Sequence, residues 1–403
     1  MKKRLLTVLL AVCLVFALGT VSAWAAEGSP VRTQDSVALV NGLYYDSLAD
    51  AVNAIDSEGT IELVGNVEIK KFNECLVIPA GKTVTLNLGM YTVKIYDFTA
   101  SFGAIKNEGT LTINAGEGGK IDSSSSSMAA QAIRNSGSMT INSGEIVGKI
   151  RAVTTANGGT TIINGGELSG NNYGVYVDDN SRVTITDNAQ VRGTATGVYA
   201  DVNSEVVISG NAKVSSESYA VKASGGDVTI QDNASITGQF GVVLANYPAN
   251  NTVEAVPSTL TMTGGTITSN AGFALSGNNL KSAGCSAEIT GGTLKSDSET
   301  GIYWPMEGEL TIGGSAVVEG ATAIQARMGE INISGNAVIK GTGAYNNDEP
   351  VSGKAAAEGS ALLITSQMYG ESDGQCATSP DITVNITGGT LESAYGNAVT
   401  VYN

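Results

Sequence analysis

The sequence contains no histidine, and this restricts the chemistry that its side chains can perform. Ser-His-Asp and Cys-His catalysis and every histidine-containing metal site are excluded. Carboxylates beside an arginine could still support calcium-dependent lyase or glycosidase chemistry. None of these groups stands in a recognisable catalytic motif, so we assign no catalytic residue. The candidates considered are Asp178, Asp179, Arg134, Arg151, Arg182, Arg192 and Arg327.

The net charge of the chain limits the classes of partner that it can bind. The formal net charge is -16 at pH 7. An acidic surface repels phosphate groups, so we expect no nucleic-acid partner. Carboxylate oxygens do attract calcium, which is the one cofactor that the composition leaves open, with no ligand set identified. Acidic side chains also keep an exported protein soluble, which is the plainer explanation.

The strands that would position such groups are predicted from an internal sequence repeat. A short strand of apolar residue, threonine and apolar residue recurs about every 22 residues. This period is too short for a propeller blade, and the leucine-rich repeat pattern is absent. Alternation sends the apolar residues inward and the threonine outward. Examples are Leu111-Thr112-Ile113, Met139-Thr140-Ile141, Val183-Thr184-Ile185 and Val228-Thr229-Ile230.

Each period holds two further strands. A second strand carries an apolar residue five or six positions later, as at Ile146 and Leu168, and a third begins at pairs such as Gly174-Val175. One coil of this kind buries its apolar side only by stacking on its neighbours. We therefore predict an all-β fold, a right-handed parallel β-helix of about thirteen coils, each with three short strands, at the usual spacing of ~4.8 Å.

Two details of the stacking can be checked. Ile163, Ile185 and Ile208 should lie directly above one another. The second strand is reached through Gly-Gly or Asn-Ala turns, where Gly or Asn accepts a left-handed conformation. We expect the turn asparagines to stack into a hydrogen-bonded ladder. They are Asn188, Asn211, Asn233 and Asn336.

Stacking of the third strand creates a candidate binding surface. Tyr176, Tyr199 and Lys222 hold equivalent outward positions, and Asp178 and Asp201 lie two residues further on. Tyrosine rings stack on sugars, and charged groups bind hydroxyls or a cation. The alternative is an ordinary sheet surface, where tyrosine is favoured and charges pair with each other.

Long insertions interrupt the coils at residues 245–258, 276–285 and 345–359. All follow a third strand, so they leave the solenoid at one corner and could form a loop-built binding face. Tolerated drift in loop length explains them equally well. The aromatic residues assigned to this face are Tyr247, Tyr303, Trp304 and Tyr345.

The first residues indicate export. Residues 1–25 combine a basic start, an apolar stretch at 5–19 and a small-x-small pattern at 23–25, as in a secretory signal peptide. Residues 26–43 follow as a linker, and 44–403 form the β-helix. No later stretch is long and apolar enough to span a bilayer. We expect a secreted or cell-surface monomer with no membrane span in the mature chain.

The two ends of the solenoid differ in sequence. Ser47 to Asp50 has the form of a capping box, and apolar residues on one helical face follow, so residues 47–56 are predicted as a capping helix. Residues 398–403 read as a strand in mid-coil, so the C-terminal end is expected to be uncapped or truncated.

Three cysteines follow the signal segment, which contains Cys13. Cys75, Cys285 and Cys376 are widely spaced and odd in number, so they form no disulfide framework. We expect free, buried thiols.

The segments 45–52, 59–63 and 78–86 carry a resemblance to a family. Tyr45-Asp46-Ser47-Leu48 and then Ile78-Pro79-Ala80-Gly81 look like the entry of pectate-lyase-like right-handed parallel β-helix proteins. These segments are especially similar to the Gram-positive bacterial cell-surface β-helix repeat proteins of this kind. The resemblance implies the fold and implies activity only weakly, because one fold hosts many functions.

These observations favour an exported, non-catalytic, adhesin-like β-helix that binds glycan or a host or matrix partner. The alternative is a polysaccharide lyase or glycoside hydrolase of the pectate-lyase-like fold, either with or without dependence on calcium. It would need carboxylates gathered beside an arginine or another acid on one outer face.

Overall fold

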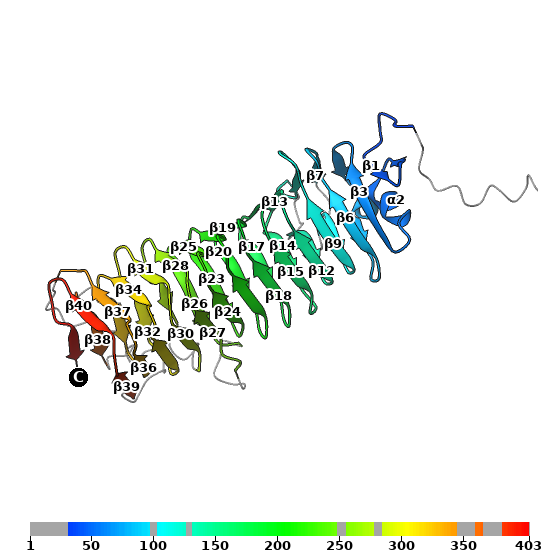
Figure 1. Cartoon of the computed structure of the whole chain (residues 1–403). Coiled ribbons are helices and arrows are strands. Elements are labelled where there is room, and N and C mark those ends of the chain that lie inside the picture. Colours follow the sequence, from blue (N-terminus) through cyan, green and yellow to red (C-terminus); the bar gives the residue numbers. More distant parts are fainter. Residues whose placement is uncertain are drawn as a thin grey trace, which may run out of the picture.

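The computed structural model describes residues 31–96, 103–125, 131–247, 255–277, 284–344, 359–365 and 381–402. The predicted signal peptide 1–25, residues 26–30 of the linker, Cys13, Cys376 and Tyr345 lie outside these residues, as does half or more of each predicted insertion. Within the described part, the fold is an elongated right-handed parallel β-solenoid (Figure 1). The predicted fold class is confirmed.

Three long sheets form the walls of the solenoid, and each turn contributes one strand to each sheet. Among the described residues, sheets B and C have 13 strands and sheet A has 15, because sheet A also holds an N-terminal hairpin. About 11 turns form the regular solenoid. This is slightly fewer than the thirteen coils predicted.

Sheet A contains the predicted apolar-Thr-apolar strands. Its strands are β1 (Ala38–Val40), β2 (Leu43–Tyr45), β3 (Glu58–Leu63), β6 (Thr83–Asn87), β9 (Thr110–Asn114), β12 (Ser138–Ile141), β15 (Thr160–Ile163), β18 (Arg182–Ile185), β21 (Glu205–Ile208), β24 (Asp227–Ile230), β27 (Thr259–Met262), β30 (Ser286–Ile289), β33 (Glu309–Ile312), β36 (Gly329–Ile333) and β39 (Ile382–Ile386).

Sheet B contains the second strand of each turn. Its strands are β4 (Val67–Ile69), β7 (Thr92–Ile95), β10 (Lys120–Asp122), β13 (Glu145–Gly148), β16 (Glu167–Gly170), β19 (Gln190–Gly193), β22 (Lys213–Ser216), β25 (Ser235–Gly238), β28 (Thr266–Ser269), β31 (Thr293–Ser296), β34 (Val317–Gly320), β37 (Val338–Gly341) and β40 (Thr390–Ser393).

Sheet C contains the third strand of each turn. Its strands are β5 (Leu76–Ile78), β8 (Ile105–Asn107), β11 (Gln131–Asn135), β14 (Arg151–Thr155), β17 (Tyr173–Val177), β20 (Thr196–Ala200), β23 (Tyr219–Ser224), β26 (Phe240–Ala245), β29 (Leu275–Ser276), β32 (Ile302–Trp304), β35 (Ile324–Ala326), β38 (Leu362–Thr365) and β41 (Val399–Tyr402).

The core is a column of like residues over like. Ile163 pairs with Ile185, which pairs with Ile208, and all three are fully buried. The predicted vertical alignment is therefore confirmed. Each fully buried aliphatic side chain of this size contributes about 1.5–3 kcal/mol. The interior lies between the three sheets along the whole solenoid.

The corners between sheets A and B differ in detail from the prediction. The left-handed residues are Asp187, Gly210 and Asp232, each directly before the asparagine that was expected to take this conformation. The predicted turn ladder is largely wrong, because only Asn233 and Asn211 are joined, at 3.4 Å. A continuous ladder forms instead on earlier turns, at the ends of strands β6, β9, β12 and β15 of sheet A. Its members are Asn87, Asn114, Asn142 and Asn164.

The N-terminal end of the solenoid is covered. The hairpin β1–β2 pairs antiparallel with β3. Helix α2 (Leu48–Asn53) lies within the predicted range and begins at Ser47, whose hydroxyl oxygen accepts from the Asp50 N–H at 3.1 Å. Leu48, Ala51 and Val52 of this helix are buried, so they close one end of the interior. A short 3-10 helix, η1 (Phe72–Glu74), follows β4.

At the other end, none of the described residues covers the last described turn. Its strands β39, β40 and β41 are the outermost of their sheets. Ile386, Val399 and Val401 occupy positions that are interior in earlier turns and are 41–58% exposed here.

Two further observations concern the cysteines and the prediction of membrane spans. Cys75 and Cys285 are free and buried, as predicted, and burial raises the pKa of each thiol to about 11. In the described part of the chain, no helix has the length and apolarity needed to cross a membrane.

Candidate functional site

The predicted alignment of Tyr176, Tyr199 and Lys222 is confirmed. The three residues are direct partners on β17, β20 and β23 of sheet C. Their neighbours Val175 and Val177 point inward and are fully buried, so the tyrosines stand on the outer face, half-buried. Strand alternation and stacking together place these side chains in one column.

Tyr176 lies at the centre of a stack. Its ring is nearly parallel to that of Tyr199, at 11° and with centroids 4.9 Å apart. The guanidinium carbon of Arg151, on the preceding turn, lies 3.7 Å from the ring centroid of Tyr176. Because Arg151 and Tyr199 come from opposite sides, both faces of Tyr176 are covered. The expectation that Tyr176 stacks directly on a sugar therefore does not fit the geometry.

Tyr173 is the aromatic residue that the sequence interpretation missed. It pairs with Arg151 in the ladder of sheet C. Its ring meets Tyr176 at 5.3 Å and 84°, and Tyr199 at 5.7 Å and 73°. The ring therefore stands edge-to-face with the stack and does not join it. The signal that could have found it is the register, which places Tyr173 and Tyr219 in a second aromatic column.

The two aspartates play different parts. The hydroxyl of Tyr176 donates to Oδ2 of Asp201 at 2.7 Å, and the N–H of Val202 donates to Oδ1 at 2.9 Å. Burial, reinforced by this carboxylate, raises the pKa of Tyr176, so the hydroxyl stays a donor. Asp178 is half-exposed and makes no side-chain hydrogen bond or ion pair within the described chain.

These residues form one unit, which we call the tyrosine cluster. It consists of Arg151, Tyr173, Tyr176, Tyr199 and Asp201, with Asp178 and Lys222 beside it. Lys222 Nζ lies 5.6 Å from the ring centroid of Tyr219, which extends the aromatic surface to the next turn.

The remaining predicted aromatics lie elsewhere. Tyr303 belongs to the same outward column as Tyr199, but Lys222, Val243 and Ser276 lie between them. It is only 9% exposed and packs on Phe273, with ring centroids 4.9 Å apart. Trp304 is fully buried, because alternation turns it to the interior with Ile302. The expectation that Trp304 lines an outer binding face is wrong for this reason.

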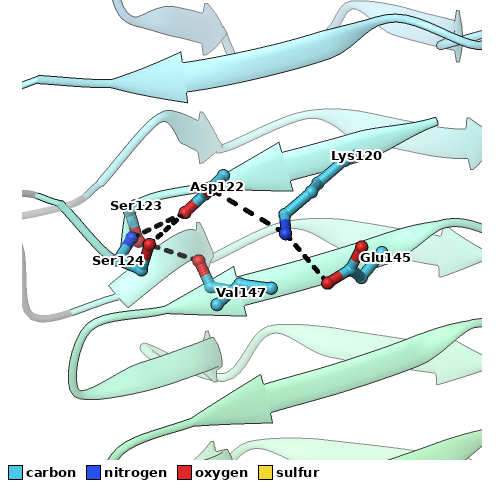
Figure 2. Close-up of polar contacts among 6 residues, drawn as sticks. All are labelled: Lys120, Asp122, Ser123, Ser124, Glu145 and Val147. Carbon is cyan, nitrogen blue, oxygen red and sulfur yellow. Dashed lines mark hydrogen bonds and ion pairs between the residues drawn. The ribbon is translucent and has the colours of Figure 1, made fainter. Parts of the chain in front are cut away.

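The outer face of sheet B begins with a paired region, shown in Figure 2. Lys120 of β10 lies 2.9 Å from Glu145 of β13 and 3.8 Å from Asp122. Burial disfavours the ionised form of Asp122, but hydrogen bonds from the side chain and N–H of Ser124, together with Lys120, outweigh it and lower the pKa of the carboxyl group. Charges in this region are satisfied by one another.

Two of the arginines considered in the sequence are also paired. Arg182 contacts Glu205 at 2.5 Å, and Arg192 contacts Glu217 at 3.0 Å. Both pairs are exposed, so each contributes at most about 1 kcal/mol. Within the described ranges, no group of three or more His, Cys, Asp or Glu residues is arranged to hold a metal ion.

Comparison with family models, curated proteins and solved structures finds no match to this chain. The resemblance to pectate-lyase-like proteins therefore remains a prediction from the residues, while the parallel β-solenoid is what the structure establishes.

Proposed function

We propose that the protein is an exported, non-catalytic β-solenoid that binds glycan chains through the tyrosine cluster of sheet C. The observation that carries the proposal is the Arg151–Tyr176–Tyr199 stack with Tyr173 set across it. Export is supported by the signal-peptide pattern of residues 1–25, and the place of action is the cell surface or the medium.

The cluster is preorganised for binding. Tyr176 is held by a cation on one face, a ring on the other and a carboxylate at its hydroxyl. Side chains fixed in this way lose little conformational entropy when a ligand arrives. Tyr176 therefore acts as a positioning residue, and its neighbours are the groups that meet the ligand.

The chemistry of those neighbours suits a sugar. Tyr173 offers an aromatic surface and a hydroxyl, and Asp178 and Lys222 offer an acceptor and a donor at the two sides of the cluster. An aromatic platform beside a few directed polar groups is the usual composition of a site for an amphipathic ring. A protein partner from a host or matrix is the comparison that a test must include.

Binding of the purified mature chain to a glycan array, with matrix proteins printed beside the glycans, tests the proposal. We expect binding to a glycan class, weakened at least tenfold by Tyr173→Ala, which corresponds to about 1.4 kcal/mol. Tyr395→Ala is the matched control, since Tyr395 is exposed and lies on the last described turn. Retention of all binding by Tyr173→Ala, or binding to matrix proteins alone, would contradict the proposal. Depolymerisation of a glycan would favour the lyase or hydrolase.

A further inference from the structure

We propose that the middle of sheet B carries a second binding site, for a neutral polyhydroxylated chain such as an oligosaccharide. The site is a shallow depression on the outer face of β16, β19, β22 and β25, which we call the central depression. It lies on a different wall of the solenoid from the tyrosine cluster and is independent of it.

The central depression is a hollow of about 490 Å³. A smaller hollow of about 270 Å³ shares Ser169 and Arg192 with it and continues to Asn171 and Thr194 at the corner toward sheet C. The polar residues on which the argument depends are Glu167, Ser169, Gln190, Lys213, Ser215 and Thr237.

These six side chains are unpaired. None of them makes a side-chain hydrogen bond or ion pair within the described residues, although Glu167, Gln190 and Lys213 are in register on successive strands. Ion pairs occur elsewhere on the outer face of sheet B. Lys120 and Glu145, which lie three and two turns before Gln190, pair with each other, and Lys340 pairs with Glu319 further along sheet B. The hollow thus gathers six unpaired polar side chains, with the paired Glu145 and Arg192 also in its lining.

The mixture of groups defines the ligand. Lys213 and the hydroxyls of Ser169 and Ser215 are donors, Glu167 is an acceptor, and Gln190 is both. A ligand that satisfies them all must itself carry many donors and acceptors, as a sugar chain does. Glu167 and the net charge of -16 disfavour an anionic chain. Because the groups follow one another from turn to turn, the chain would lie along the solenoid axis.

Titration of the full mature chain with cellohexaose, maltohexaose and hexagalacturonate, followed by calorimetry and saturation-transfer NMR, tests this site. We expect one neutral hexasaccharide to bind better than hexagalacturonate. The variant Gln190→Ala/Lys213→Ala should weaken that binding at least tenfold. The matched control, Thr293→Ala/Lys295→Ala, removes a polar residue and a lysine from the same face on β31, where Lys295 is already paired with Asp297.

Tyr173→Ala separates this site from the tyrosine cluster, because it should leave the affinity of the central depression unchanged. Melting curves establish that each variant is folded. Binding by Gln190→Ala/Lys213→Ala within twofold of the control, tightest binding of hexagalacturonate, or no binding of any of the three probes would each overturn the inference.

Discussion

Over the same turns, the outer faces of sheets B and C differ in how their polar side chains are paired. On sheet C, Tyr176 stacks between the Arg151 guanidinium and the Tyr199 ring and donates its hydroxyl to Asp201. On sheet B, Glu167, Gln190 and Lys213 stand in register without partners. Both faces rest on one buried column of aliphatic residues, so the core does not cause the difference. Whether a surface side chain finds a partner therefore varies from turn to turn and does not follow from the fold.

The corner at Gly170, between sheets B and C, should be the position where a substitution destabilises the protein most. Gly170 ends β16, and a Cβ there would lie 2.0 Å from the carbonyl oxygen of Tyr173 and 2.7 Å from that of Ile150. Backbone atoms at these distances must move, so Gly170→Ala should lower the free energy of unfolding by about 3 kcal/mol. Urea denaturation measures it. Ser169→Ala, on the same strand, should change it by less than about 0.5 kcal/mol. Similar values for both variants would show that the corner is adaptable.

Removal of the Tyr176 ring should lower the free energy of unfolding more than removal of a side chain from sheet B. Tyr176→Ala removes contacts with Arg151 and Tyr199 and the hydrogen bond to Asp201, so a loss of about 2 kcal/mol is expected. Tyr176→Phe keeps the stack and should lose about 1 kcal/mol. Gln190→Ala on sheet B should lose less than about 0.5 kcal/mol. Thermal and urea unfolding give the three values, and an equal loss for Tyr176→Ala and Gln190→Ala would refute the contrast.

The smallest effect concerns the paired region of sheet B. The lowered pKa of Asp122 means that its ionised form stabilises the fold. This contribution is present above the ordinary carboxyl pKa of about 3.9 and is lost as pH falls through the lower pKa of the folded state. At neutral pH, Asp122→Asn should cost less than about 1 kcal/mol and remove this part of the acid dependence. Glu167→Gln, which breaks no pair, is the neutral-pH control. Unfolding curves at pH 7 and pH 3 measure it, and an unchanged pH 3 to pH 7 difference in Asp122→Asn would exclude Asp122 as its source.

The sequence predicts the parts of the molecule that depend on alternation and period. Ile163, Ile185 and Ile208 stack because every turn must bury the same side. The same rule aligns Tyr176 with Tyr199. Applied more strictly, alternation would also have turned Trp304 inward, because it stands two residues after Ile302.

Other features could not be predicted because alternation fails where a strand enters a corner. Gly174 and Val175 are both buried, so Tyr173 and Tyr176 face outward at a spacing of three and not two. Simple alternation therefore overlooks Tyr173. The central depression was missed for a different reason, since whether Glu167 or Lys213 finds a partner depends on side-chain conformation as well as residue type.

The parallel ladders of sheets B and C have one further consequence. All strands of each wall run the same way, so neither surface looks the same when the molecule is turned end over end. A linear polymer lying along the rod would meet Glu167 before Lys213 in one orientation and after it in the other. A sugar chain has two chemically distinct termini, so if the central depression holds one as proposed, the two orientations would make different contacts and one would be favoured.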